Sequence, residues 1–401
     1  MKTIDDIEVT NQRVLLRADL NAPMKQDTSG VMQITDDGRL KASVTTINNL
    51  RDKKAKIIIL AHLGRPKGER KPELSLKPIA KRLGELLNTP IQFIENLNDA
   101  NTLKTVNALQ PGEVAMVENI RFEKDETSKD NVERIRLAQI LASLADVFVI
   151  DGFGVVHREQ ASVTDVARLL PKAAGRLVQA EQKAFSKVLN NPERPYVVVL
   201  GGSKVSDKLG VINNLINKVD KLLIGGGMAF TFLKAQGFEV GDSLLEVDRI
   251  DEVKQLMITA KEKNVEIVLP VDVVICAQLD GSAPVSIVDA QQIPVGQKGL
   301  DIGPKTGEIF ANKIKDAKTV VWNGPMGVFE VNAFAAGTKT IAQALADSNA
   351  YSVVGGGDSA AAIRLLGLDE SKFDHISTGG GASLELLEGK VLPGLAVLEE
   401  E

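Results

Sequence analysis

Short apolar runs rich in β-branched residues recur along the chain at intervals of a few dozen residues. Five lie in the first half, at 13–21, 56–65, 91–95, 113–122 and 146–154, and five in the second, at 196–202, 221–227, 266–274, 319–325 and 351–357. Because these runs are continuous and do not alternate with polar residues, they predict strands that are buried on both faces.

Segments with helical periodicity lie between the predicted strands. Residues 74–88 and 208–219 carry leucine, isoleucine or valine three to four positions apart, so each predicts an amphipathic helix. Strands that alternate with helices indicate parallel sheets covered by helices, and we therefore expect an α/β fold in each half. A further helix is expected over 179–191, where Asn191 and Pro192 end it, and it would bridge two lobes.

Length and charge narrow the possible functions. A chain of 401 residues is long for one hydrophobic core, so two domains are expected. The net charge of −5 and the lack of a long lysine or arginine run argue against a general nucleic-acid or anionic-membrane surface. The N-terminus shows no signal sequence, and no apolar run approaches the ~20 residues that span a bilayer. The sequence therefore predicts a cytoplasmic protein.

The few histidines and the lone cysteine limit the metal and nucleophile chemistry. Three histidines and one cysteine exclude a thiolate-rich or multi-histidine metal site, but a hard cation held by a carboxylate and a phosphate stays open. Cys276 lies in an apolar run that predicts a buried strand, which makes it a poor candidate nucleophile.

Polar residues follow the predicted strands of the first half, where ligands bind in open α/β sheets. The planar fork of arginine matches carboxylate and phosphate groups, so several arginines and a histidine at one sheet edge predict a pocket for a small, doubly anionic molecule. Each residue alone is more typical of a solvated or ion-paired side chain, and the prediction rests on their repeated position. The set is Asp19, Asn21, Arg39, His62, Arg65, Arg121 and Arg158.

Glycine-rich segments follow the predicted strands of the second half, at 201–204, 225–229, 323–327 and 355–359, with another at 377–383. Glycine permits tight turns and lets backbone N–H groups approach phosphate oxygens, so several such ends in one lobe predict a nucleotide site. The segment 355–359 leads into a predicted helix, whose N-terminus favours anions. Asp358 there either holds a phosphate-bound Mg²⁺ or caps the helix, and the sequence leaves both readings open.

Two lysines follow the first of these glycine segments, four residues apart. Their spacing differs from that of the P-loop, which has Gly, four residues and then Gly-Lys-Ser/Thr. The following helix begins either near Ser203, with Lys204 and Lys208 on one face, or at Ser206, with Lys204 in the loop and Lys208 in the first turn. Both placements set cations near a helix N-terminus, which disfavours each by ~0.3–1 kcal/mol. We therefore expect a polyanion between them.

Together these segments resemble the phosphoglycerate kinase family over nearly the whole chain. The matching motifs, in the order expected of the family, are RADLNAP, TDDGRLK, AHLGRPKG, ENIRF, DGFGVVHR, GGSKVSDKLG, LLIGGGMAFTFLK, LDIGPKT, VVWNGPMGVFE, VVGGGDSAAA and STGGGASLE. Departures are slight: Ser203 stands where alanine is common, and GFGVV replaces the frequent AFGTA before His157 and Arg158. Neither departure touches a lysine or arginine to which the resemblance gives a role.

The resemblance implies two Rossmann-like lobes, each a parallel sheet flanked by helices, joined by an interdomain helix and a hinge. The implied bounds are 1–175 for a 3-phosphoglycerate lobe, 176–191 for the helix, 192–385 for a Mg-nucleotide lobe and 386–401 for a tail that returns to the N-terminal lobe. The implied reaction is the reversible phosphoryl transfer between 1,3-bisphosphoglycerate and ADP, with Mg²⁺ as cofactor and hinge bending between the lobes. A monomer that binds neither nucleic acid nor membrane is expected.

The resemblance also implies residue roles. Arg39, Lys204 and Lys208 would be catalytic, because they stabilise the charge of the transferred group. Substrate contacts are implied for Asp19, Asn21, Arg39, His62, Leu63, Gly64, Arg65, Arg121 and Arg158. Nucleotide contacts are implied for Lys208, Gly226, Gly227, Leu300, Asn323, Glu330, Gly356, Gly357, Asp358 and Ser359, with Asp358 as the metal ligand. Gly379 and Gly380 would supply backbone donors to the transition state.

Two other classes of protein compete with this interpretation. An NAD-dependent dehydrogenase needs a GxGxxG fingerprint, which the sequence lacks. A non-catalytic two-lobe protein that binds small anions also closes on its ligand, and it is the better rival. Such a protein has no need of the Lys204 and Lys208 pair or of the 355–359 segment.

Overall fold

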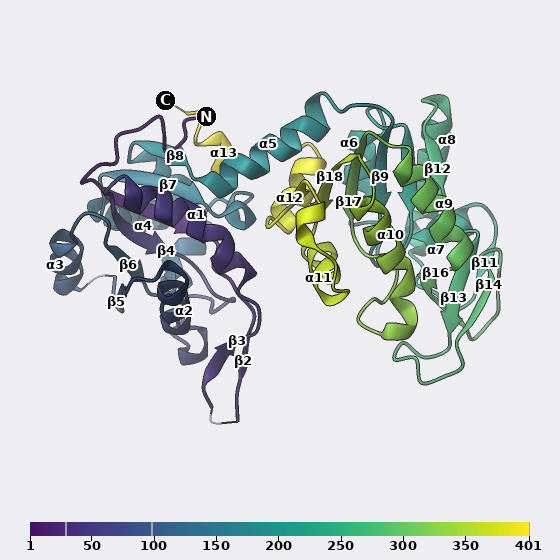
Figure 1. Cartoon of the computed structure of the whole chain (residues 1–401), viewed down its shortest axis with the longest axis horizontal. Helices are drawn as coiled ribbons and strands as arrows, with labels where there is room; N and C mark the ends of the chain where they lie inside the picture. The colour runs from purple at the N-terminus through teal and green to yellow at the C-terminus, as the bar shows by residue number, and fades with distance from the viewer. Residues whose placement is uncertain (29, 98, 401) are drawn as a thin grey trace. The chain divides into compact units, whose positions relative to one another are not determined.

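Two six-stranded parallel sheets, one in each half of the chain, form the framework of the protein (Figure 1). The computed structural model describes residues 1–28, 30–97 and 99–400. The chain divides into two units after Gln182, within helix α5 (Arg176–Asn190). Unit 1 comprises Met1–Gln182 and the residues from Val391 onward, and unit 2 comprises Lys183–Lys390. The two parallel sheets flanked by helices confirm the predicted α/β fold.

The sheet of unit 1 has the strand order β5-β6-β4-β1-β7-β8, and all its pairs are parallel. The central strand β1 pairs Val14 with Ile57 on one side and with Val147 on the other. Its neighbours are buried along almost their whole length, as the continuous apolar runs predict. The strands are β1 (Arg13–Ala18), β4 (Lys56–Leu60), β5 (Ile91–Ile94), β6 (Val114–Val117), β7 (Val147–Asp151) and β8 (Lys172–Ala174).

Helices and a short hairpin complete unit 1. Helix α2 is shorter than the predicted segment 74–88. It begins at Lys77 with Pro78 in its first turn, and Asn88 ends it in the left-handed conformation. The C-terminal segment packs on this unit, where the Gly394 N–H donates to the carbonyl of Val156 at 2.7 Å. The elements are β2 (Met24–Gln26), β3 (Met32–Ile34), α1 (Gly38–Asp52), α2 (Lys77–Leu87), α3 (Ala100–Ala108), α4 (Asn131–Ser143) and α13 (Pro393–Ala396).

Unit 2 repeats the architecture with the strand order β12-β10-β9-β17-β18-β19, again with parallel pairs. Trp322, in β17, is fully buried in its core. The strands are β9 (Tyr196–Leu200), β10 (Lys221–Ile224), β12 (Glu266–Val268), β17 (Thr319–Asn323), β18 (Tyr351–Gly355) and β19 (His375–Ile376). The helices are α6 (Leu209–Leu215), α7 (Ala229–Ala235), α8 (Ile250–Glu262), α9 (Pro304–Lys315), α10 (Ala336–Ala346), α11 (Gly357–Leu365) and α12 (Gly381–Leu387).

Two sequence-based expectations about unit 2 are wrong in detail. The run 266–274 is two strands that belong to different sheets, because β12 ends at Val268 and Pro270 follows. The second part, β13 (Asp272–Cys276), forms an antiparallel sheet with β14 (Ser286–Asp289) and β16 (Lys298–Ile302), beside a small pair of β11 (Glu239–Val240) and β15 (Gln292–Ile293). Helix α6 is shorter than the predicted 208–219, since its α-helical geometry ends at Leu215.

Two further features of the chain bear on its class. Cys276 is buried in β13, as its apolar surroundings predict. Among the residues that the structure describes, none of the helices combines the length and the apolar character needed to cross a membrane.

Asp151 ends β7 and lies fully buried below the start of α5. Its Oδ1 accepts a hydrogen bond from the Leu177 N–H at 2.9 Å, and its Oδ2 is buried without a partner among the described residues. Burial raises the pKa of this carboxyl to about 7. The folded protein therefore favours the protonated acid well above the pH at which the unfolded chain releases that proton.

The raised pKa makes a prediction about stability and pH. A raised carboxyl pKa contributes stability that is complete below the unfolded value of 3.8 and is lost as the pH rises toward 7. Through this group, the wild type should lose about 4 kcal/mol of unfolding free energy between these two pH values. Asp151→Asn, which mimics the protonated acid, should not show this loss. Urea denaturation at a series of pH values measures this difference.

The control is Asp146→Asn directly before β7, where hydrogen bonding to Arg13 lowers the carboxyl pKa. In this variant the unfolding free energy should still fall as the pH rises from 3.8 toward 7, as it does in the wild type. Equal pH profiles for wild type and Asp151→Asn would contradict the account.

Candidate functional site

A continuous chain of polar contacts joins the residues that follow the strands of unit 1. Arg39, in the first turn of α1, forms an ion pair with Asp19. Asp19 Oδ1 accepts from the Asn21 N–H at 3.3 Å, and Asn21 Oδ1 accepts from the Gly64 N–H at 2.9 Å. The Gly64 carbonyl in turn accepts from Arg121 Nη1 at 2.7 Å. The loops after β1, β4 and β6 are therefore held in one constellation.

Asn119 and Glu118, directly after β6, fix these loops from below. Asn119 Nδ2 donates to the Leu63 carbonyl at 2.8 Å, while its Oδ1 accepts from the Arg121 N–H at 3.1 Å. The Glu118 carboxylate accepts from the Leu76 N–H at 2.8 Å, immediately before α2. These buried side chains set the positions of the backbone that carries His62, Leu63 and Arg121.

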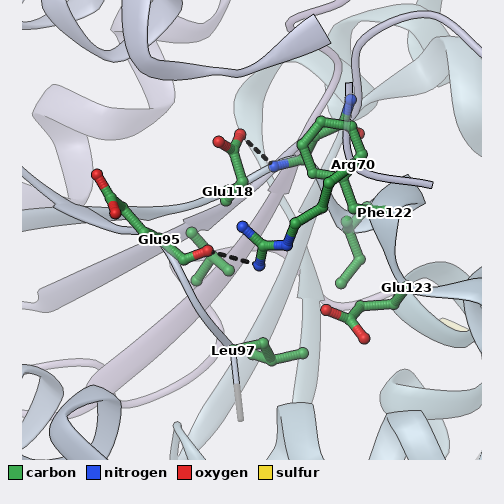
Figure 2. Close-up of a pocket in the computed structure, with 9 residues that line it drawn as sticks. Arg70, Glu95, Leu97, Glu118, Phe122 and Glu123 are labelled. Atoms are coloured by element: carbon green, nitrogen blue, oxygen red, sulfur yellow. Dashed lines mark hydrogen bonds between the residues drawn. The ribbon is translucent and has the colours of Figure 1, made fainter. Parts of the chain in front are cut away.

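A small pocket is lined in part by Glu118 and Asn119, which also support these loops (Figure 2). In it Arg70 donates to the Glu95 carbonyl at 2.8 Å, and its guanidinium lies 5.9 Å from the centre of the Phe122 ring. None of the predicted substrate residues lines this pocket. Its lining residues are Arg70, Glu95, Leu97, Val117, Glu118, Asn119, Ile120, Phe122 and Glu123.

The electrostatics of the constellation favour an anion. Burial lowers the pKa of Arg121 to about 10, and the charges of Arg17 and Arg158 act in the same direction. Burial alone would raise the pKa of Asp19. Electrostatic interaction with Arg39, His62 and Arg17 and the hydrogen bond from the Asn21 N–H together outweigh burial and hold the Asp19 pKa below its usual value. A bound anion would relieve the repulsion among these guanidinium groups.

Gly154, from the DGFG segment after β7, is required by the Arg39 and Asp19 pair. A side chain at Gly154 would overlap Asp19 Oδ2 and come within 3.3 Å of Arg39 Nη1. The glycine therefore lets the backbone after β7 approach the ion pair.

Most of the predicted substrate residues meet in this constellation. The contacts join Asp19, Asn21, Arg39, Leu63, Gly64 and Arg121, and His62 interacts electrostatically with Asp19 and Arg121. Arg158 is exposed and close enough to Arg121 to lower its pKa. Arg65 directly follows Gly64 and is exposed, and no hydrogen bond or ion pair joins it to the set within the described residues.

Sequence reasoning missed the buried polar residues behind the site. Arg17 is fully buried in β1, and the signal that it gives is a lone charge within an apolar run. Asn119 also follows a strand and was within reach of the same argument. Glu126 lies in a strongly charged stretch and gives no signal of its own burial.

In unit 2 three glycine turns fit against one another at the strand ends. The Gly202 N–H donates to the Pro325 carbonyl at 2.9 Å, and the Gly226 N–H donates to the Met326 carbonyl at 3.1 Å. Gly226 has φ +64°, and a side chain there would lie 2.7 Å from the backbone of Gly202. The expectation that these amides are free for phosphate is therefore wrong for Gly202 and Gly226, because neighbouring turns already use them.

The two lysines lie before helix α6, which begins at Leu209 with Lys208 as its N-cap. Neither Ser203 nor Ser206 starts the helix, and Lys204 lies exposed in the loop. Lys208 Nζ donates to Asn323 Oδ1 at the end of β17. Burial lowers the pKa of Lys208, although the charges of nearby carboxylates act to raise it. The Asn323 Nδ2 is buried with no partner in the described part of the chain, so a donor remains at this point.

The 355–359 segment forms the N-terminus of α11. Gly356, with φ +90°, is the N-cap, so Asp358 lies in the first turn and does not cap the helix. Asp358 is exposed and contributes to the electrostatic surroundings of Lys208. The first N–H groups of a helix have no intrahelical acceptor, so this end can bind an anion.

The remaining predicted nucleotide residues have varied surroundings. Leu300 is buried and Glu330 is exposed. The Ser359 hydroxyl is buried and accepts from the Gly324 N–H at 2.8 Å. The Gly379 N–H already donates to Ser377 Oγ at 3.1 Å, while Gly380, with φ +52°, is the N-cap of α12.

The donor set in unit 2 fits a magnesium ion that is held partly by phosphates. No group of three or more histidine, cysteine or acidic side chains suitable for a metal occurs within the described ranges. Mg²⁺ is commonly held by one or two carboxylates together with substrate phosphates, and Asp358 supplies one such carboxylate beside Lys208.

Several known proteins are similar to this chain over all or nearly all of its length. The phosphoglycerate kinase family profile matches residues 4–390. The chain is 56% identical over 406 residues to "Phosphoglycerate kinase" of Bifidobacterium longum subsp. infantis, covering 100% of both chains. The solved phosphoglycerate kinase of Coxiella burnetii is similar with TM-score 0.86 and 41% identity, covering 99% of this chain and 98% of that one. That of Pyrococcus horikoshii OT3 has TM-score 0.86 and 34% identity, covering 100% and 98%.

The interlocking turns of unit 2 predict a difference between two glycine substitutions. Gly226 and Gly296 both have positive φ, but nothing lies within 4 Å of a side chain added at Gly296. We expect Gly296→Ala to cost about 1–2 kcal/mol of unfolding free energy, from backbone strain alone. Gly226→Ala should cost about 1–3 kcal/mol more, because the methyl group also meets the Gly202 backbone.

Denaturant unfolding of the two variants measures the difference, and calorimetry with ADP measures its effect on binding. Equal destabilisation by the two substitutions would show that the close approach of the turns is not a constraint.

Proposed function

Because the chain belongs to the phosphoglycerate kinase family, we propose that unit 1 binds 3-phosphoglycerate or 1,3-bisphosphoglycerate and that unit 2 binds ATP or ADP. The chain is a phosphotransferase of glycolysis with a carboxyl group as acceptor. The observation that carries this conclusion is the family match over almost the whole length, since both halves of the reaction's machinery lie within it.

The substrate site that we propose is the polar constellation of unit 1. Arg39, in the first turn of α1, pairs with Asp19, and Arg121, after β6, donates to the Gly64 carbonyl. Arg65 follows Gly64 directly, and Arg158 lies on the loop after β7. Guanidinium groups suit the phosphate and the carboxylate of 3-phosphoglycerate, and Asn21, His62, Leu63 and Gly64 shape the site between them.

The nucleotide site that we propose is the set of strand ends in unit 2. The close-packed turns at Gly226 and Gly227 would form the surface on which the nucleotide lies. The N-terminus of α11 would offer backbone donors to phosphate at Gly356 and Gly357. We assign Asn323, Lys208 and Ser359 to the phosphate side, with Leu300 at the base and Glu330 at the ribose. Asp358 would hold Mg²⁺, which supplies charge neutralisation on the nucleotide phosphates when bound.

The chemistry needs charge stabilisation and no general base. The 3-phosphoglycerate carboxylate attacks the terminal phosphorus of ATP, the bond from that phosphorus to the bridging oxygen breaks, and ADP leaves with its electron pair. Both the attacking and the leaving group are anions, so no proton has to be removed. We assign Arg39 and Lys204 to the charge on the transferred group, Lys208 to the nucleotide phosphates, and Gly379 and Gly380 to backbone donation.

We also infer a monomer that acts in the cytoplasm. A single buried cysteine leaves no internal disulfide, as is usual in a reducing compartment. Light scattering after size-exclusion chromatography measures the oligomeric state directly.

The proposed roles predict how two substitutions act. We expect Arg39→Ala and Lys204→Ala each to lower kcat by about 10²–10³-fold, with a smaller effect on substrate KM, because each group acts mainly on charge in the transition state. The measurement is a coupled assay of ATP-dependent phosphorylation of 3-phosphoglycerate with Mg²⁺. Lys261→Ala, at the end of α8, is the matched control and should behave as wild type.

Two results would contradict the proposal. No turnover by well-folded wild-type protein with Mg²⁺, ATP and 3-phosphoglycerate would refute the function. Variants that raise KM alone would show that the two residues only bind ground-state substrate.

A further inference from the structure

A fully buried polar relay lies behind the proposed substrate site. Arg17 in β1 and Glu126 in the turn Lys124–Thr127 are both completely inaccessible to solvent, as is Ser162 in the segment Ala161–Asp165. Burying a guanidinium is costly unless a carboxylate compensates its charge and its N–H groups are bonded. Neither Arg17 nor Glu126 has a role in the phosphoryl transfer described above.

The hydroxyl of Ser162 connects the two charges in a fixed direction. Glu126 accepts from the Ser162 hydroxyl at 2.6 Å through Oε1 and from the Ser162 N–H at 2.9 Å through Oε2. A hydroxyl has one proton, so its lone pairs face the other side, where Arg17 Nε donates to it at 2.8 Å. Arg17 Nη1 also donates to the Ala18 carbonyl at 2.6 Å, so Ser162 and Glu126 fix the Nε side of a guanidinium that the backbone of β1 holds as well.

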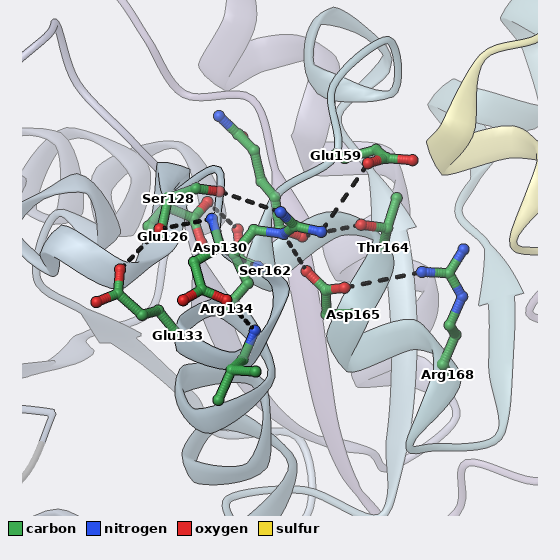
Figure 3. A network of polar contacts seen from close by, with 12 residues as sticks. Glu126, Ser128, Asp130, Glu133, Arg134, Glu159, Ser162, Thr164, Asp165 and Arg168 are labelled. Carbon is green, nitrogen blue, oxygen red and sulfur yellow. Dashed lines mark hydrogen bonds and ion pairs between the residues drawn. The ribbon is translucent and has the colours of Figure 1, made fainter.

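A second buried ion pair holds the segment that carries Ser162 (Figure 3). Arg134 of α4 donates to Asp165 at 2.9 Å, and both side chains are at most 7% exposed. Arg134 also donates to the Ser128 carbonyl at 3.1 Å, close to the turn that carries Glu126. Through Arg134, the segment that carries Ser162 and the turn next to Glu126 are thus both held to helix α4.

The other end of the relay meets His62. Arg17 Nη2 lies 3.4 Å from His62 Nδ1. A guanidinium has only donors, so Nδ1 has to be the acceptor in this contact. In a neutral imidazole whose Nδ1 accepts, the proton is on Nε2. Within the described residues Nε2 makes no hydrogen bond, which leaves its N–H free for a ligand.

We propose that Glu126 and Ser162 are positioning residues that, through Arg17, hold His62 as the neutral Nε2–H tautomer, which donates a hydrogen bond to an oxygen of the anionic substrate. This inference rests on the proposed function of unit 1 and adds the tautomer and its cause. The charged groups that face His62 are Arg17, Asp19, Arg121 and Arg39. Burial, followed by the charge of Arg17, holds the His62 pKa well below its usual value, which agrees with a neutral ring at pH 7.

The neutral form has a chemical consequence. A histidine that bound as the imidazolium would lose substrate affinity as the pH rises through its pKa, whereas a neutral donor does not. The contribution of His62 to substrate binding is therefore constant across neutral pH. Three surrounding arginines already supply positive charge, so the imidazole adds direction to the site and not further charge.

Nitrogen NMR of the full-length protein, labelled with ¹⁵N-histidine, tests the tautomer directly. The His62 signals are identified by their loss in His62→Gln, since the chain has only three histidines. We expect a protonated Nε2 and an unprotonated Nδ1 at neutral pH in the wild type without substrate. A protonated Nδ1, or the imidazolium at pH 7, would overturn the proposal. This test uses the wild-type protein, so it does not depend on whether a variant of Arg17, Ser162 or Glu126 folds.

Substitution then tests the relay. We expect Ser162→Ala to populate the Nδ1–H tautomer and to raise KM for 3-phosphoglycerate about tenfold, or about 1.4 kcal/mol, with KM for ATP unchanged. Glu126→Gln, which keeps the shape but removes the charge, should act in the same direction on KM for 3-phosphoglycerate. Arg136→Ala is the matched control, because Arg136 pairs with Asp125, next to Glu126, on the exposed side.

The outcomes separate this proposal from the function. A wild type that phosphorylates 3-phosphoglycerate but has the wrong His62 tautomer refutes the relay alone. The relay is also refuted if Ser162→Ala keeps the wild-type tautomer and KM. Absence of turnover in the wild type refutes the proposed function, whatever the tautomer.

Discussion

Burial of both faces of each parallel sheet is the constraint on which the rest of the structure depends. Strands such as β4 and β7 expose almost none of their surface, so their side chains are nearly all apolar. Polar groups that serve a ligand can then stand only where the strands end. The constellation around Asp19 and Arg121 and the glycine turns of unit 2 both lie at such ends.

The two units meet this constraint in different ways. Unit 1 gathers charged side chains on its loops and supports them with buried polar residues, among which Asn119 bonds to two loops at once. Unit 2 brings the backbone itself together, and glycines such as Gly226 are required because a side chain would collide with the next turn. Arg17 is the exception in β1, since a full charge inside the sheet has to be matched by buried partners.

Much of the fold and the loops of the site followed from the pattern of the sequence. Continuous apolar runs located the buried strands, and polar residues after them located Asp19, His62 and Arg121. The run 266–274 misled because an apolar strand does not reveal which sheet it joins. Glu126 and Ser162 stayed hidden, since their burial depends on contacts between segments far apart in the chain, which the local sequence around each residue does not indicate. The start of α6 was misplaced because Lys208 serves as its N-cap.

The central claim is that the two substrates bind at the strand ends of two different units. Mapping of backbone amide NMR shifts in the full chain tests it most directly, with 3-phosphoglycerate and ADP added separately. The account predicts that 3-phosphoglycerate first shifts the amides of the loops after β1, β4 and β6. It predicts that ADP with Mg²⁺ first shifts those after β9, β10 and β18. Primary shifts from both ligands in the same unit would contradict it.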